Sequence, residues 1–239
     1  MSLYLELMKK ALLNTIYEDP PDSPWHSGFD LGTRLKGEDW PSLAHTMIGK
    51  KRLDNLEFLI GEIVKNDIPG GLIETGVWRG GACIFMAACL EEFKRKRAIY
   101  CCDSFEGLPK PDTAYPIDSE DRHHTYRQLA VSLEQVKANF RRYDLLSRNI
   151  IFVPGWFEKT LPTLNVDFAL LRLDGDMYGS TMVALENLYP RLSPGGYCII
   201  DDFGVVYGCQ QAVIDYINKH EIVEAFHTID ASAIYWRKS

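Results

Sequence analysis

The sequence predicts an α/β fold, with one mostly parallel seven-stranded sheet and helices on both of its faces. From residue 70 onward, short apolar runs alternate with segments of helical periodicity. Most of these runs show no alternation of polar and apolar residues, which is typical of strands buried on both faces of a parallel sheet. The last two runs have no helix between them. We therefore expect an antiparallel strand at the end of the sheet.

The N-terminal part of the chain carries helical patterns and no clear strand. Apolar spacing predicts an amphipathic helix over residues 3–17, and a second helix over residues 51–66. Three prolines predict a loop over residues 18–32. We interpret residues 1–66 as a helical cover and residues 67–239 as the core of a single domain.

The core alternates strands with helices. Strands are predicted at 71–75, 98–104, 149–155, 166–176 and 195–203. Helices are predicted at 81–95, 132–143, 180–192 and 209–220. The tail predicts two strands joined by a turn near Asp230. A polar loop at 105–131 is long enough to be an active-site lid. This order is typical of a Rossmann-like methyltransferase sheet.

Composition excludes several classes of function. The chain has 239 residues, of which 46% are hydrophobic and 25% charged, as in ordinary soluble domains. The net charge of −7 argues against nucleic acid or an anionic membrane as a partner. No apolar stretch approaches the ~20 residues that span a bilayer, and no signal peptide is recognisable. Six cysteines without CxxC spacing are expected to be buried, reduced thiols of a cytoplasmic protein.

The first strand is followed directly by the glycine-rich turn ETGVWRGG, residues 74–81. Its spacing, E-x-G-x-x-x-G, differs from the dinucleotide fingerprint G-x-G-x-x-G. An acid at Glu74 would repel a pyrophosphate but suits a cationic group such as the ammonium of an amino acid. Asp103 ends the second strand, where an acid can accept ribose hydroxyl hydrogens. Together these acids favour S-adenosylmethionine over NAD, so an NAD-linked sugar oxidoreductase is disfavoured.

Four carboxylates end two later strands, Asp174 and Asp176 after one and Asp201 and Asp202 after the next. Carboxyl ends of parallel strands meet at one edge of a sheet, so these acids are expected to lie close together. Oxygen ligands suit Mg²⁺ or Ca²⁺, and Mn²⁺ also accepts them. A cation there could stabilise the alkoxide of an acceptor hydroxyl while a carboxylate takes its proton.

Several strings, in this order, resemble the macrocin O-methyltransferase family: DWPSLAHTMIGKKRLDNL (39–56), ETGVWRGG, DSFEGLP, RLDGDMY with the following ST, LSPGGY and DDF. The resemblance covers most of the chain, from about Asp39 to Gly208. It implies methylation of sugar hydroxyls, typically on deoxysugars of macrolide or aminocoumarin antibiotics, with S-adenosylmethionine and Mg²⁺. The family usually has an acid where this chain has Gly179, so substrate contacts near that position are expected to differ.

The resemblance also implies roles for individual residues. The implied cofactor contacts are Thr46, Met47, Glu74, Thr75, Gly76, Val77, Trp78, Asp103, Ser104, Gly155, Trp156 and Asp174. Among them, Asp103 and Ser104 would hold the ribose, and the Gly155–Trp156 turn would lie near the adenine. The implied metal ligands are Asp174, Asp201 and Asp202. Asp176 would be the general base, although a metal-bound Asp174 could also accept the proton.

Alternatives remain at this point. A metal-dependent catechol or phenol O-methyltransferase needs the same acids, and a non-catalytic S-adenosylmethionine-binding protein needs the same cofactor turn. His123 and His124 in the long loop are either a second base, substrate contacts or solvated residues. The acceptor is expected to be a small, glycosylated molecule. The apolar stripe of the first helix could support a homodimer or a larger homo-oligomer, although it more simply covers the core.

Overall fold

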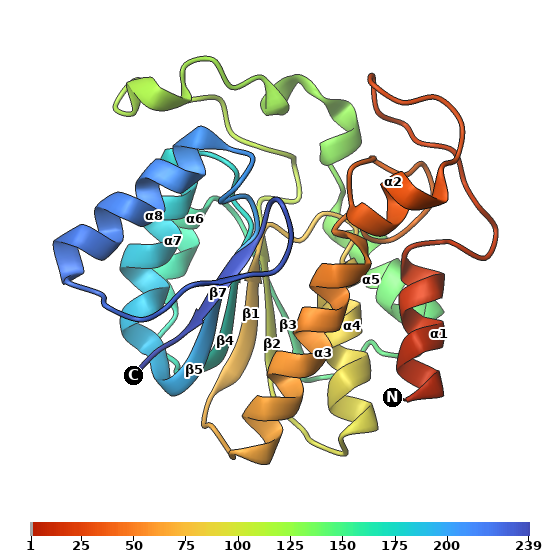
Figure 1. Cartoon of the computed structure of the whole chain (residues 1–239), viewed down its shortest axis with the longest axis horizontal. Coiled ribbons are helices and arrows are strands. Elements are labelled where there is room, and N and C mark those ends of the chain that lie inside the picture. Colours follow the sequence, from red (N-terminus) through yellow and green to blue (C-terminus); the bar gives the residue numbers. More distant parts are fainter. Residues whose placement is uncertain (1) are drawn as a thin grey trace.

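The computed structural model describes residues 2–239 and contains one seven-stranded sheet in the order β3-β2-β1-β4-β5-β7-β6 (Figure 1). The first five strands are parallel, β7 is antiparallel to β5, and β6 is antiparallel to β7. The strands are β1 (Gly71–Thr75), β2 (Ile99–Asp103), β3 (Ile150–Pro154), β4 (Phe168–Leu173), β5 (Leu192–Ile200), β6 (His227–Thr228) and β7 (Ile234–Arg237). The predicted α/β fold and its antiparallel end are confirmed.

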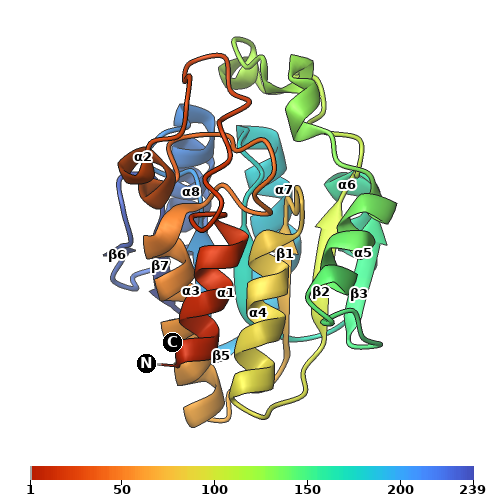
Figure 2. The same ribbon diagram turned by 90° about the vertical axis from the view of Figure 1, so that its right-hand side faces the viewer.

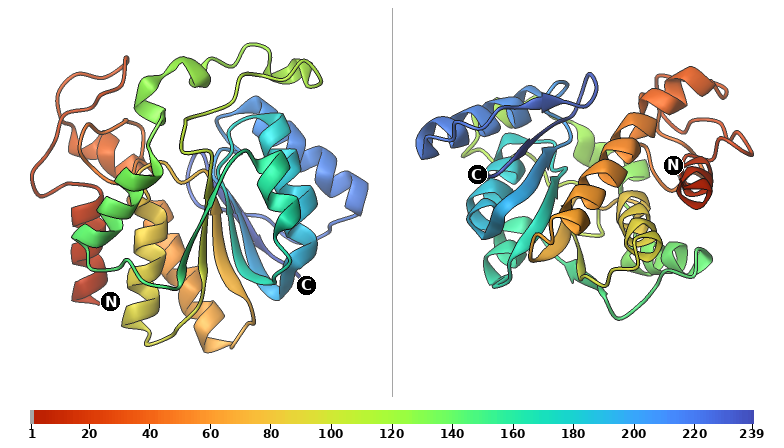
Figure 3. Two further views of the ribbon diagram at one scale, coloured as in Figure 1. Left: turned by 180° about the vertical axis from the view of Figure 1, so that it is seen from behind. Right: turned by 60° about the horizontal axis from the view of Figure 1, so that its bottom comes forward.

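Helices cover both faces of the sheet, as Figure 3 shows from below. The helices are α1 (Leu3–Leu12), α2 (Leu31–Lys36), α3 (Gly49–Lys65), α4 (Gly81–Glu92), α5 (Leu133–Arg142), α6 (Phe157–Thr160), α7 (Tyr178–Leu188) and α8 (Tyr207–His220). One hydrophobic cluster joins α1, α3, α4 and α5 to one face of the sheet, and a second joins α7 and α8 to the other. β4 is buried along its whole length between the two clusters, which explains its lack of alternation.

Two local predictions in the N-terminal part were wrong. The helix predicted to reach residue 17 ends at Leu12, because Asn14 adopts a left-handed φ of 51° and its side chain donates to Asp19 at 2.7 Å. The predicted loop over residues 18–32 runs into a short helix, α2, that was not predicted. Its signals were present in the sequence: Asp30 accepts from the backbone N–H of Thr33, and Gly37 ends the helix with φ of 73°.

Arg34 holds the N-terminal segment together although it is fully buried. Its Nη1 donates to Asp19 and to the carbonyl of Leu13, both at 2.8 Å, and its Nε donates to both oxygens of Asp39 at 2.9 Å. Buried charges are tolerated when they are paired and hydrogen-bonded in this way. The network holds together the N-terminal segment, which Figure 2 shows beside the long loop above the sheet.

The strand order places a crevice at the carboxyl edge of the sheet. From β1 the chain proceeds to β2 and β3 on one side, then crosses back to β4 and β5 on the other. The segments that follow β1 and β4 therefore diverge, and ligands of open α/β sheets bind at such a switch point. The long loop, residues 105–131, lies above this edge (Figure 2). Within residues 2–239, no helix is long and apolar enough to cross a membrane.

We predict that Arg34→Met will lower the free energy of unfolding by about 3–5 kcal/mol, because it leaves Asp19 and Asp39 buried without their cation. Urea denaturation measures this change. The control is Arg148→Met at an exposed position, which should leave stability nearly unchanged. Equal, small effects of the two substitutions would contradict the structural role of Arg34.

Candidate active site

A cavity of about 930 Å³ opens at the switch point between β1 and β4. It collects most of the residues that the sequence singled out, from six separate segments of the chain. These are Thr46, Met47, Glu74, Gly76, Val77, Trp78, Asp103, Ser104, Trp156, Asp174, Asp176, Asp201 and Asp202. Two predicted cofactor residues do not line it. Thr75 is buried in β1, and Gly155 forms the turn that precedes Trp156.

Glycines let the backbone approach closely in the turn after β1. Gly76 has φ of 84°, and a Cβ atom there would lie 1.8 Å from the carbonyl oxygen of Asp174. At Gly81, the first residue of α4, a Cβ atom would lie 2.3 Å from the carbonyl oxygen of His45. The turn is thus packed between β4 and the N-terminal cover, and only glycine fits at either position.

Asp103, at the end of β2, holds this turn in place. Its Oδ2 accepts from the backbone N–H of Val77 at 2.7 Å and of Trp78 at 3.3 Å, and its Oδ1 accepts from that of Phe105 at 2.7 Å. Burial raises the pKa of Asp103, while these hydrogen bonds oppose the shift. Much of the hydrogen-bonding capacity of the carboxylate is therefore used by the fold itself.

Arg172 is the central cation of the site, and the sequence reasoning missed it. It is fully buried in β4, with Glu74 as its cross-strand neighbour in β1. Its Nη1 contacts Glu74 and donates to Asp174 at 2.8 Å, and its Nη2 donates to Asp201 at 2.5 Å. Burial works against the charged guanidinium, but the three carboxylates outweigh it and raise the pKa of Arg172.

Arg52 of α3 connects the N-terminal cover to the same acids. Its Nη1 donates to Asp201 at 2.6 Å, and its Nε donates to Asp230 at 2.8 Å. Asp230 in turn accepts from the backbone of Ser232 and Ala233, in the predicted turn of the tail. Helix α3 and the β6–β7 turn are therefore both anchored at the end of β5.

Glu74 is not free to bind a ligand by itself. One oxygen contacts Arg172, and the other accepts from the thiol of Cys83 at 2.8 Å. Burial raises the pKa of Glu74 to about 7, against the attraction of Arg172. The expected contact with a ligand ammonium would have to share these oxygens. Cys83 and the other five cysteines are free and buried.

Three of the four aspartates converge in the cavity. One oxygen each from Asp174, Asp176 and Asp202 lies within 4.8 Å of the other two. The Oδ2 atom of Asp202 is buried without a hydrogen-bond partner within residues 2–239. Such an orphaned buried acceptor is rare unless an ion or water completes it.

The three carboxylates repel one another. Burial and the neighbouring acids raise the pKa of all three, that of Asp176 to about 7. Asp176 also has a left-handed φ of 54°, which is uncommon for a residue other than glycine. Strained backbone of this kind is often found at functional sites. The arrangement fits a divalent cation that prefers oxygen ligands.

Asp201 differs from the other aspartates of the cavity in its hydrogen-bond partners. Both oxygens of Asp201 accept from arginines, Oδ1 from Arg172 and Oδ2 from Arg52. Asp201 also lines the cavity, but the arginines engage its oxygens, whereas one oxygen each of Asp174, Asp176 and Asp202 lies close to the other two. Sequence spacing could not separate Asp201 from Asp202, because the arginines that engage the oxygens of Asp201 come from distant segments of the chain.

The long loop is fixed to the site by Asp118. This buried carboxylate accepts from the backbone N–H of Tyr178 at 2.8 Å and of Gly179 at 3.1 Å, and so caps the N-terminus of α7. A Cβ atom at Gly179 would lie 2.8 Å from the ring of Tyr115. The glycine that departs from the family pattern therefore makes room for the loop to pack on α7.

Comparison with known proteins identifies the family. The sequence model described as Macrocin-O-methyltransferase (TylF) matches residues 21–238. The chain belongs to the macrocin O-methyltransferase family. It is therefore an O-methyltransferase, and its sheet is that of class I S-adenosylmethionine-dependent methyltransferases. The family resemblance, the fold class and the enzyme class predicted from the sequence are confirmed.

Similar curated proteins extend over nearly the whole chain. The 8-demethyl-8-(2,3-dimethoxy-α-L-rhamnosyl)-tetracenomycin-C 4'-O-methyltransferase of Streptomyces olivaceus is 48% identical over 98% of this chain and 92% of its own. The mycinamicin III 3''-O-methyltransferase of Micromonospora griseorubida is 44% identical over 100% of this chain and 97% of its own. The solved O-methyltransferase NovP superposes with a TM-score of 0.95 at 45% identity, covering 99% of this chain and 98% of that one.

Removing the central cation should make stability strongly pH-dependent. In Arg172→Met, the pKa values of Glu74 and Asp174 should rise further above their values in the unfolded chain. A carboxylate whose pKa is raised by folding does not change the free energy of unfolding at a pH where it is protonated in both the folded and the unfolded chain. It lowers that free energy most at a pH above its pKa in the folded chain. We expect a loss of about 3–5 kcal/mol at pH 8 and a smaller loss at pH 5.

Urea denaturation of wild type and variant at both pH values tests this expectation. Arg172→Lys is the matched control, because it keeps the charge but replaces the planar, five-donor guanidinium with a single ammonium group, and it should be destabilised less. A loss for Arg172→Met that is the same at pH 5 and pH 8 would contradict the electrostatic role of Arg172.

Proposed function

We propose that the enzyme transfers a methyl group from S-adenosylmethionine to a sugar hydroxyl of a glycosylated natural product, with the assistance of Mg²⁺. The observation that carries the proposal is the convergence of Asp174, Asp176 and Asp202 in the cavity at the switch point. The names of relatives that are 44–48% identical to the whole chain support the acceptor class, since they specify O-methylation of rhamnosyl tetracenomycin and of mycinamicin III.

The cofactor would lie over the ends of β1 and β2. The residues proposed to hold it are Thr46, Met47, Gly76, Val77, Trp78, Asp103, Ser104 and Trp156, all of which line the cavity. S-adenosylmethionine supplies an electrophilic methyl group on a sulfonium. The glycines of the turn let backbone N–H groups approach it, and Asp103 keeps that turn in position through the N–H groups of Val77 and Trp78. Solved neighbours with this fold include one bound to S-adenosylhomocysteine.

Asp174 and Asp202 are the proposed metal ligands. Both line the cavity, and the unpartnered Oδ2 of Asp202 marks where a ligand atom is available. Mg²⁺ would lower the pKa of an acceptor hydroxyl and orient it. Asp201 has a supporting role, because it pairs with Arg172 and Arg52 beside these ligands.

Asp176 is the proposed general base. Burial and Asp174 raise its pKa to about 7, which is near the value at which a carboxylate accepts a proton effectively at neutral pH. Arg172 fixes Asp174 beside it. The cavity walls would exclude water and hold the acceptor oxygen near Asp176, so that most of the rate gain comes from positioning.

Metal binding can be measured without turnover. We expect added MgCl₂ to raise the melting temperature of the wild type and to have no such effect on Asp174→Asn or Asp202→Asn. This rise in melting temperature should be larger at pH 7.5 than at pH 5.5. Metal binding requires deprotonated carboxylates, and the pKa values of these carboxylates are raised.

Asp201→Asn is the matched control. If Asp201 only supports the ligands, this variant should be less stable than the wild type but should keep the MgCl₂ effect. Loss of the effect in Asp201→Asn, with its retention in Asp202→Asn, would restore Asp201 as a ligand in place of Asp202.

Methyl transfer tests the function itself. Purified enzyme, S-adenosylmethionine and MgCl₂ are incubated with the three glycosylated acceptors that the relatives' names specify: the rhamnosyl tetracenomycin, demethyldecarbamoylnovobiocin and mycinamicin III. We expect mass spectrometry to detect a gain of one methyl group on at least one of them. Asp176→Asn should lower kcat by about 10²–10⁴-fold with little change in cofactor affinity. No transfer to any of the three, or full activity of Asp176→Asn, would contradict the proposal.

A further inference from the structure

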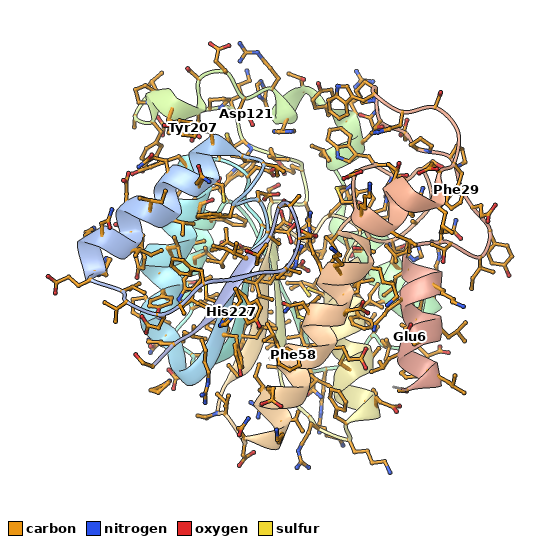
Figure 4. The ribbon with its side chains drawn as sticks, viewed as in Figure 1. Glu6, Phe29, Phe58, Asp121, Tyr207 and His227 are labelled. Carbon is orange, nitrogen blue, oxygen red and sulfur yellow. The ribbon has the colours of Figure 1, made fainter. Side chains whose placement is uncertain are left out.

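The long loop brings an oriented histidine into the cavity, and the function proposed above does not use it. His123 and Asp176 both line the cavity. The Nδ1 atom of His123 is 2.6 Å from Oδ2 of Asp121, and its backbone N–H donates to the other oxygen of Asp121 at 2.8 Å. Asp121 thus fixes both the backbone and the ring. Figure 4 labels Asp121 on the loop above the sheet.

The second ring nitrogen of His123 is available to a ligand. Nδ1 is its only hydrogen-bonded ring nitrogen in the described part of the chain, and the side chain is 30% exposed. With Nδ1 held by Asp121, a neutral ring accepts a hydroxyl hydrogen at Nε2, and a charged ring donates a hydrogen there. Either form can therefore hold an alcohol oxygen.

Aromatic rings surround this histidine on the cavity wall. The ring of His123 lies 6.3 Å from that of Trp40 and 6.2 Å from that of Tyr126, between centroids. Trp40 also packs against Tyr126 at 5.2 Å and Trp25 at 4.9 Å. These contacts join the N-terminal segment to the long loop. Of the two tryptophans, Trp40 lines the cavity.

Two contacts hold the part of the long loop that carries His123 in a fixed position. Asp118 anchors the loop on α7, the helix that starts two residues after Asp176. The indole N–H of Trp78 donates to the carbonyl of Gln128 at 2.8 Å, which ties the loop to the turn after β1 as well. His123 lies between these two anchors in the sequence, so its ring is held at a defined place relative to Asp176.

We propose that Trp40 and His123 form the subsite for the acceptor sugar, in which the indole covers an apolar ring face and His123 Nε2 holds a hydroxyl near Asp176. The subsite rests on the proposed function, because it takes a polyhydroxylated ring as the acceptor. The hydrogen bond to Asp121 raises the pKa of His123, and the charge of Asp176 adds to this rise. Asp121 acts as a positioning residue.

Kinetics and binding of His123 variants test the subsite. We expect His123→Ala to lower kcat/KM for the acceptor roughly tenfold, the effect of one lost hydrogen bond of moderate strength. The KM for S-adenosylmethionine and the melting temperature should stay close to wild type. His123→Gln should retain more activity, because its amide can still hold a hydroxyl. Asp121→Asn should fall between wild type and His123→Ala.

The matched control is His227→Ala on β6, which Figure 4 labels at the sheet edge away from the loop. It should leave all these parameters unchanged. Acceptor kinetics of His123→Ala within twofold of wild type would overturn the subsite. A parallel loss of cofactor affinity and melting temperature would also overturn it, since His123 would then be structural.

A binding measurement separates this inference from the proposed function. The same three glycosides are titrated into wild type and His123→Ala with S-adenosylhomocysteine present, and tryptophan fluorescence is recorded. Binding that weakens roughly tenfold in the variant supports the subsite, whether or not a methyl group is transferred. Absence of methyl transfer would contradict the proposed function alone. If the wild type binds none of the three, the subsite is overturned.

Discussion

The buried guanidinium of Arg172 sets the geometry on which the site depends. It contacts carboxylates that follow or end three adjacent strands: Glu74 of β1, Asp174 after β4 and Asp201 after β5. Each acid alone would be costly to bury, and three acids together would repel one another. One planar cation with several donors compensates all three and fixes their relative positions. The metal ligands and the base proposed here are neighbours of this cluster, so their placement follows from it.

The same electrostatic principle extends to the segments around the sheet. Arg52 carries the connection from Asp201 to Asp230, and thereby joins α3 and the β6–β7 turn to the end of β5. Arg34 gathers the N-terminal segment through Asp19 and Asp39. These segments supply Thr46, Met47 and Trp40 to the cavity. The cover is therefore part of the site, and not only a lid on the hydrophobic core.

The sequence predicted what depends on local pattern. Strands β1 to β5 and their helices were found because buried parallel strands have apolar runs, and the turn after β1 was found through its glycines. What it did not predict depends on contacts between distant segments. The hydrogen bonds by which Asp103, the expected ribose ligand, holds the turn after β1 were not predicted. Asp118 lies in the predicted loop 105–131, and its capping of α7 was not predicted.

Arg172 could have been found from the sequence. A charged residue in the middle of the apolar run FALLRL is rarely buried without a partner. In a strand, Arg172 and Asp174 point to the same face, since side chains alternate with a period of two. The partnership with Glu74 and Asp201 could not have been found in this way, because it requires the register of β1 against β4 and of β4 against β5.

The two arginines stabilise the site by pairing with some of its acids, and they leave other acids unpaired. Arg172 contacts Glu74, Asp174 and Asp201, and Arg52 contacts Asp201 and Asp230. Within residues 2–239, neither Asp176 nor Asp202 forms an ion pair with either arginine or with any other cationic side chain. These two acids therefore leave up to two negative charges facing the cavity. Burial raises their pKa values, and the neighbouring acids add to the rise. A divalent cation matches this charge and prefers these oxygen ligands. The arginines thus bind the acids that shape the site and leave Asp176 and Asp202 available to a ligand.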